Sequence, residues 1–69
     1  MNISARNQLR GTVKSVTLGA VMAEVTVDVS GQDVVSAITK TSAESLGLRE
    51  GSEVIVLIKA TEVMLGTET

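Results

Sequence analysis

The chain has 69 residues, of which 43% are hydrophobic and none is aromatic, and this length is enough for one domain. At this size folding buries only about 60% of the surface that the unfolded chain exposes, so the core is marginal. Because the chain has no cysteine and no histidine, a disulfide and a Cys/His zinc site are excluded, and we expect one domain over residues 1–69 that gains stability as a homo-oligomer. A net charge of −2, no membrane-length apolar run and no signal-peptide pattern argue against nucleic acid, membrane and secretion, so the expected compartment is cytoplasmic.

Alternation of apolar and polar residues predicts three strands in the first half of the chain. Residues 9–18 form a β-rich stretch with polar side chains mostly on one face, and a glycine and an alanine then interrupt it. Residues 21–29 show the clearest period of two in the chain. Residues 30–31, Ser-Gly, favour a tight turn, so residues 33–39 are expected to pair back as a hairpin.

The stretch TSAESLGL, residues 41–48, predicts a short helix. Thr41 can act as its N-cap while Glu44 reaches back to the Thr41 amide, which is the reciprocal capping box. Gly47 is placed to end the helix in a left-handed conformation.

The last third of the chain predicts one or two further strands. After a turn at residues 49–52, residues 54–59 are apolar on nearly both faces, which is typical of a central strand. Residues 61–65 are expected to form a last edge strand, and residues 66–69 to fray. Four or five short strands with one short helix before the penultimate one predict an all-β fold, a small OB-like β-barrel.

The side-chain inventory gives little support for catalysis. Without histidine or cysteine, a nucleophile or general base would have to come from serine, lysine or a carboxylate, and the eight acidic residues are scattered. No D-x-D cluster concentrates oxygen ligands for a bare metal ion. OB-like surfaces that bind nucleic acid use aromatic rings and a basic groove, and this chain has neither. We therefore expect no enzyme, no cofactor and no nucleic-acid partner.

A set of hydrogen-bond donors remains, and together these donors favour a small pocket for a tetrahedral anion. They are Ser4, Arg6, Asn7, Thr39, Thr41, Ser42, the helix-opening amides near Ala43, and Lys59. A helix N-terminus and hydroxyls offer donors to an oxyanion, and one arginine with one lysine would balance a dianion. Each residue alone has a structural alternative, because chain termini are usually poorly ordered, hydroxyls cap helices, and lysine can extend its stem over an apolar face.

The segments SARNQLRGTV (residues 4–13) and AITKTSAESLGLREGSEVIVLIKATEV (residues 37–63) resemble the molbindins, small cytoplasmic molybdate-binding proteins built from a Mop or TOBE-type domain. The resemblance covers roughly residues 3–64. It implies an OB-like β-barrel that assembles as a homohexamer, a trimer of dimers, and holds molybdate or tungstate between subunits.

The resemblance also implies which residues bind the anion. The main interfacial ligands would be Ser4, Arg6, Thr39, Ser42, Ala43, Lys59 and Ala60. A second oxyanion pocket, around a threefold axis, would lie near Gly19, Ala20, Val21 and Met22. Arg6 would then reach from its arm into the pocket of a neighbouring subunit.

The expected function is intracellular storage or homeostasis of molybdate, and of tungstate. Two alternatives stay open from the sequence. A structural or protein-interaction module would not respond to molybdate and would co-purify with a partner protein. An oxyanion sensor or donor would deliver the anion to molybdenum cofactor synthesis.

Overall fold

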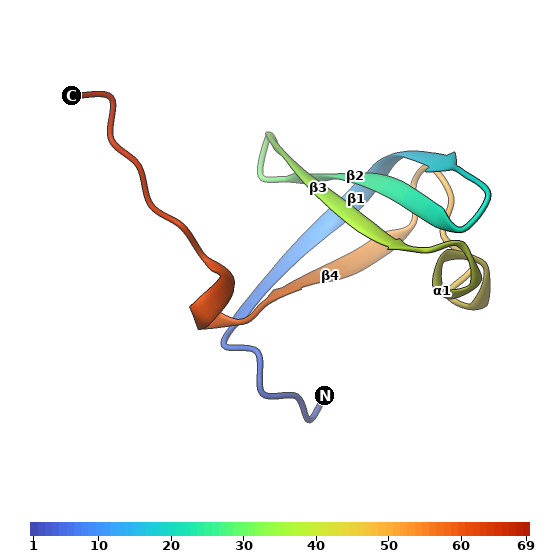
Figure 1. Cartoon of the computed structure of the whole chain (residues 1–69), viewed down its shortest axis with the longest axis horizontal. Coiled ribbons are helices and arrows are strands. Elements are labelled where there is room, and N and C mark those ends of the chain that lie inside the picture. The colour runs from blue at the N-terminus through green and yellow to red at the C-terminus, as the bar shows by residue number, and fades with distance from the viewer.

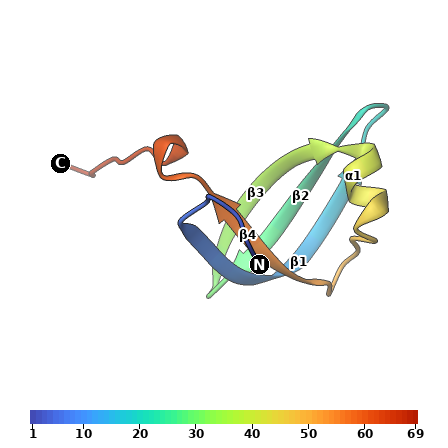
Figure 2. The same cartoon turned by 90° about the horizontal axis from the view of Figure 1, so that it is seen from below.

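The computed structural model describes residues 1–69 and contains one antiparallel sheet with the strand order β3-β2-β1-β4 (Figure 1). The elements in chain order are β1 (Asn7–Leu18), β2 (Met22–Val29), β3 (Gln32–Thr39), α1 (Lys40–Ser45), β4 (Glu53–Ile58) and the 3₁₀ turn η1 (Ala60–Glu62). The sheet is strongly curved, with α1 at one end (Figure 2). The all-β class with one short helix is confirmed, and the arrangement is that of an OB-like barrel left open between β3 and β4.

β1 bends where it changes partners. Its first half pairs with β4 and its second half with β2, and the two ladders meet at Thr12. A register shift between Val13 and Ser15 follows within the β1–β2 ladder. At Val13 the backbone of β1 is hydrogen-bonded to the turn before β4. The Val13 amide donates to the Ser52 carbonyl and the Gly51 amide donates to the Val13 carbonyl, each at 2.9 Å. A bulge of this kind increases the local twist, which helps to curl the sheet.

The core is as small as the chain length predicts. Only five of the 69 residues are buried, and three of them form one cluster of valines, Val13, Val25 and Val27. The other two are Ala23 in β2 and Ala43 in α1. The partly buried side chains packed against the cluster are Val16, Val29, Ile38, Leu48, Val54 and Val56. The strands therefore supply most of the core, and Ala43 of α1 and Leu48 after it complete it.

The two tight turns have the predicted chemistry. Ser30 and Gly31 have φ angles of 51° and 87°, and two consecutive positive φ angles are the signature of the type I′ hairpin turn, so the β2–β3 hairpin is confirmed. Lys14 of β1 donates a hydrogen bond to Asp33 at the start of β3, at 2.8 Å. That hydrogen bond and the attraction between the two charges raise the pKa of Lys14. Gly47 has a φ of 63° and ends the helical segment as predicted.

Two predictions for the end of the chain are wrong. β4 is an edge strand and not a central one, because it pairs with β1 alone, and its outward side chains Ile55 and Leu57 remain 38% and 43% exposed. Residues 61–65 form no strand, because no ladder in this chain receives them. Instead the Glu62 amide donates to the Lys59 carbonyl at 2.8 Å to form η1, and residues 63–69 have no regular structure and project away from the sheet (Figures 1 and 2).

The single α-helix, α1, has six residues, so no helix in the structure could cross a membrane.

Candidate functional site

The first group of predicted site residues lies where β1 begins and β4 ends. Asn7 and Ile58 are partners in the β1–β4 ladder, and the Asn7 side-chain amide also donates to the Ile58 carbonyl at 3.1 Å. This pairing holds Arg6, which precedes Asn7, beside Lys59, which follows Ile58. Both cations are exposed, and neither forms a salt bridge. We call Ser4, Arg6, Lys59 and Ala60 the arm group; all four are exposed.

The second group lies at the start of α1, and here one prediction is wrong. Thr39, and not Thr41, is the N-cap, because β3 runs as far as Thr39 and the helix begins at the next residue. The Thr39 hydroxyl accepts from the Ser42 amide at 3.0 Å and donates to the Ser42 hydroxyl at 2.8 Å. A capping box between Thr41 and Glu44 is therefore absent. We call Thr39, Ser42 and Ala43 the helix group.

The corrected cap changes which backbone donors are free. In a helix capped at Thr39, the first intrahelical bond uses the amide of Ala43, whose residue is buried at 3% exposure. The Ser42 amide is taken by the cap, whereas the Thr41 amide has no hydrogen-bond partner. The sequence position of Thr41 predicts a cap, whereas its free amide follows only from the end of β3 at Thr39.

The residues predicted for a second pocket lie beside the helix group. Met22 is the ladder partner of Thr39, and the first helical amide, that of Lys40, donates to the Val21 carbonyl at 2.7 Å. The Gly19 amide donates to the Met22 carbonyl at 2.7 Å and closes the β1–β2 turn. Val21 and Met22 are 70% and 47% exposed, so this hairpin tip presents an apolar surface next to the start of α1.

The arm group and the helix group are far apart within one chain. The arm group adjoins the first residue of β1, whereas the helix group adjoins the hairpin that follows the last residue of β1. β1 has 12 residues, which corresponds to roughly 36 Å of extended strand. Figures 1 and 2 accordingly place η1 at the opposite end of the sheet from α1. One anion cannot contact both groups of the same chain.

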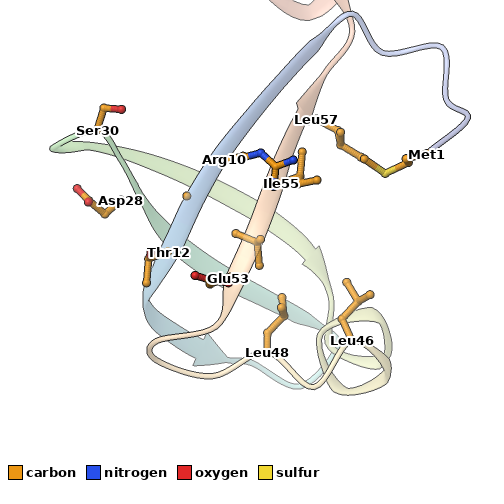
Figure 3. Close-up of a pocket in the computed structure, with 12 residues that line it drawn as sticks. Met1, Arg10, Thr12, Asp28, Ser30, Leu46, Leu48, Glu53, Ile55 and Leu57 are labelled. Carbon is orange, nitrogen blue, oxygen red and sulfur yellow. The ribbon is translucent and has the colours of Figure 1, made fainter.

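Neither groove on the surface of the single chain contains the predicted site. The larger one, of about 830 Å³, contains Arg10 but also the carboxylates of Asp28 and Glu53, which disfavour an anion (Figure 3). The smaller one, of about 290 Å³, is almost entirely apolar. No group of three or more His, Cys, Asp or Glu side chains is placed to hold a metal ion.

The TOBE domain family model matches residues 3–65 of the chain. The chain belongs to the TOBE domain family. This TOBE domain is 50% identical over 66 residues to molybdenum-pterin-binding protein 3 of Clostridium pasteurianum, a match that covers 94% of this chain and 97% of the relative. The resemblance that the sequence motifs indicated is thereby confirmed at the level of the family.

Solved structures agree with this assignment. A molybdate-binding protein from Sporomusa ovata superposes on this TOBE domain with a TM-score of 0.92 at 43% identity, covering 97% of this chain and all of the other. The cytoplasmic molybdate-binding protein ModG, in a crystal form with molybdate bound, gives a TM-score of 0.89 at 45% identity, covering 96% of this chain and 48% of ModG. None of these three relatives is described as an enzyme.

Proposed function

We propose that this chain binds molybdate, and the isosteric tungstate, in pockets formed where two copies meet, as an intracellular storage or homeostasis protein and not as an enzyme. The observation that carries this proposal is the separation of the arm group from the helix group along β1. Each group is an exposed half of a donor set, and a second copy can bring the two halves together. The relatives described as molybdate-binding proteins support the choice of anion.

The chemistry of the two halves is complementary to a dianion. Arg6 and Lys59 supply two positive charges that no acidic side chain neutralises in this chain. Thr39 and Ser42 add hydroxyls, and Thr41 adds a free amide. Charge-assisted hydrogen bonds from arginine to oxyanions are among the stronger polar contacts in proteins.

Ala43 and Ala60 have no polar side chain, so we propose that they shape the pocket wall. A smaller anion of the same charge, such as sulfate, would leave some donors unpaired, at a cost of about 1–3 kcal/mol for each buried group. Phosphate at neutral pH would bring a proton, which the arginine, lysine and backbone-amide donors of this site cannot accept. The size of the cavity between copies would therefore select molybdate and tungstate.

The assembly we propose is a homo-oligomer, a hexamer built as a trimer of dimers. It is supported by the five-residue core and by the large apolar side chains left exposed on a single chain. Those at the β1–β2 hairpin end include Leu18, Val21 and Met22, which are 47–70% exposed. Contact between these tips would place residues 19–22 of several copies around one axis, where we propose the second, separate oxyanion pocket.

A pterin is a second candidate ligand, because several relatives are named molybdenum-pterin-binding proteins. The composition of this chain favours the bare oxyanion. A planar pterin is typically held by stacking on an aromatic ring, and the chain contains none. A protein-interaction module, or a sensor or donor for cofactor synthesis, would use the same fold. We propose the cytoplasm as its compartment, as in the cytoplasmic ModG.

Thermal unfolding with added anions tests the proposed function. A ligand that binds only the native assembly, at 100 times its dissociation constant, adds about 2.7 kcal/mol to the free energy of unfolding. We expect molybdate and tungstate to raise the Tm by several degrees, and equal concentrations of sulfate, or of a pterin without molybdenum, to raise it much less. Equal shifts with molybdate and sulfate would contradict an oxyanion pocket of this selectivity.

A further inference from the structure

The side chain of Asn7 adds a hydrogen bond at the end of the β1–β4 ladder. Asn7 and Ile58 are the end pair of that ladder, and the Asn7 side-chain amide donates to the Ile58 carbonyl at 3.1 Å. A carbonyl oxygen can only accept, so the side chain presents its nitrogen to β4 and not its oxygen. The bond is partly buried and joins residues 51 positions apart. Asn7 therefore fastens the start of β1 to the end of β4, next to η1 (Figure 1).

This fastening lies where the two strands would otherwise separate. The ladder stops before Arg6 and Lys59, which would be its next pair, and neither cation forms a salt bridge. Like charges opposite each other on paired strands are destabilising, and chain termini fray readily. Asparagine is also depleted in strands, so its strand propensity does not account for its presence at this position. Its hydrogen bond to Ile58 does, because that bond opposes both the repulsion and the fraying.

The segments on either side of this pair are held as well. The Gln8 side-chain amide donates to the Ala5 carbonyl at 3.1 Å and so links the residues before β1 to the second residue of that strand. After β4, the Lys59 carbonyl accepts from the Glu62 amide at 2.8 Å, which fixes the backbone of Lys59 at the start of η1. Asn7 supplies the side-chain bond that connects these two held segments.

We propose that Asn7 is a positioning residue for the anion: its hydrogen bond to Ile58 sets Arg6 beside Lys59 before the anion binds. Donors that are already in place lose less conformational freedom on binding than donors that must first be ordered. Asn7 acts through the two cations of the arm group and not as a ligand. The inference rests on the proposed function, because it concerns how the arm group of that site binds.

Asn7→Leu tests the proposal, because leucine is close to asparagine in size but cannot donate a hydrogen bond. We expect calorimetry to show the same number of molybdate sites as in the parent chain, with an affinity about 3- to 10-fold weaker, the range of one net hydrogen bond. Asn7→Gln keeps the amide donor on a longer side chain and should bind more tightly than Asn7→Leu. The reverse order would overturn a role for the donor.

Gln32→Leu is the matched control, because it also replaces an amide side chain at the first position of a strand. Gln32 begins β3, is exposed, and takes part in none of the side-chain hydrogen bonds of the structure. We expect this variant to bind molybdate as the parent chain does. A loss equal to that of Asn7→Leu would overturn the proposal.

Repeating Asn7→Leu in two other backgrounds separates positioning from a general structural effect. In an Arg6→Ala chain the side chain to be positioned is absent, so Asn7→Leu should weaken binding by less than about twofold more. In a Ser42→Ala chain, whose change lies in the helix group, the loss of about 3- to 10-fold should remain. Equal losses in the two backgrounds would assign Asn7 to the fold or to direct contact with the anion, and would overturn the proposal.

Folding and assembly of Asn7→Leu are measured by circular dichroism and by mass in solution, and both should match the parent chain. Failure to fold or assemble would overturn the proposal, since Asn7 would then hold the fold and not the arm group. The failures of the two proposals are distinguishable. A parent chain that binds no molybdate contradicts the proposed function and this inference with it, whereas equal affinities of a binding parent chain and Asn7→Leu contradict only the positioning role.

Discussion

Gly11→Ala is expected to destabilise the fold by about 3 kcal/mol, the upper end of the range for overpacked cores. A Cβ atom on Gly11 would lie 2.6 Å from the Val27 Cγ1 and 2.7 Å from the backbone oxygen of Asp28. The side chain of Val27 belongs to the buried cluster, and the Asp28 oxygen belongs to the β2 backbone, so neither atom can move cheaply. Because β2 passes this close to β1 at Gly11, only glycine fits at this position.

The loss is large for this chain, since 69 residues correspond to a total stability of only about 3–10 kcal/mol. Urea unfolding followed by far-ultraviolet circular dichroism measures it, because there is no aromatic ring to serve as a fluorescent probe. Gly66→Ala is the matched control: a Cβ there meets nothing within 4 Å, and we expect a change below about 0.5 kcal/mol. Equal midpoints for the two variants would refute the close approach of β1 and β2.

Arg6→Ala is expected to weaken molybdate binding by about 10- to 100-fold while the protein still folds and assembles. Hydrogen bonds to charged groups contribute about 1.5–3 kcal/mol, which corresponds to that range. Arg6 precedes β1, is exposed, and forms no salt bridge within its own chain, so its removal costs the fold little. Lys59→Ala should have a similar effect, and Arg6→Lys a smaller one because the charge remains but the planar fork is lost.

Isothermal titration calorimetry measures both the affinity and the number of sites. Arg49→Ala is the control, because it removes one exposed positive charge from the turn before β4 and changes the net charge by the same amount. We expect it to bind molybdate as the parent chain does. If Arg6→Ala and Arg49→Ala have the same affinity, Arg6 acts through general charge and is not a ligand.

Local patterns predicted the strands and turns well. The period of two placed the first three strands within two residues of β1, β2 and β3, because alternation reports which face of a strand is buried. The Ser30-Gly31 turn was also predictable, since its positive φ angles are a local property of those two residues.

The errors arose where structure depends on partners distant in the sequence. Whether the apolar strand β4 is central or at an edge depends on which strands flank it, and side-chain pattern alone does not contain that information. The helix cap moved from Thr41 to Thr39 because pairing with Met22 extends β3 to that residue. Residues 61–65 have the composition of a strand but form no strand, because they have no ladder partner within the chain.

For the candidate site, the sequence predicted the kinds of residues but not how they are arranged. Arginine, lysine and hydroxyl groups without histidine or cysteine indicate anion binding by donors, and that reasoning needs no coordinates. The separation of the arm group from the helix group follows only from the register of β1 with β4 and of β2 with β3. Under the proposed function, this separation requires two copies for one site.

Mixing two inactive variants tests most directly whether two copies share the site. Arg6→Ala with Lys59→Ala removes the cations of the arm group, and Ser42→Asp puts a repelling carboxylate in the helix group at a position where acidic residues favour helix formation. Each variant alone should fail to bind molybdate.

After the two variants are refolded together, some sites combine the intact arm group of the Ser42→Asp variant with the intact helix group of the double variant. Calorimetry should then find about a quarter of the parent's sites at near-parent affinity. The reason is that the arm group and the helix group of each site come at random from either variant, so both are intact in about one site in four. A mixture that assembles normally and still binds no molybdate would contradict a site shared between copies.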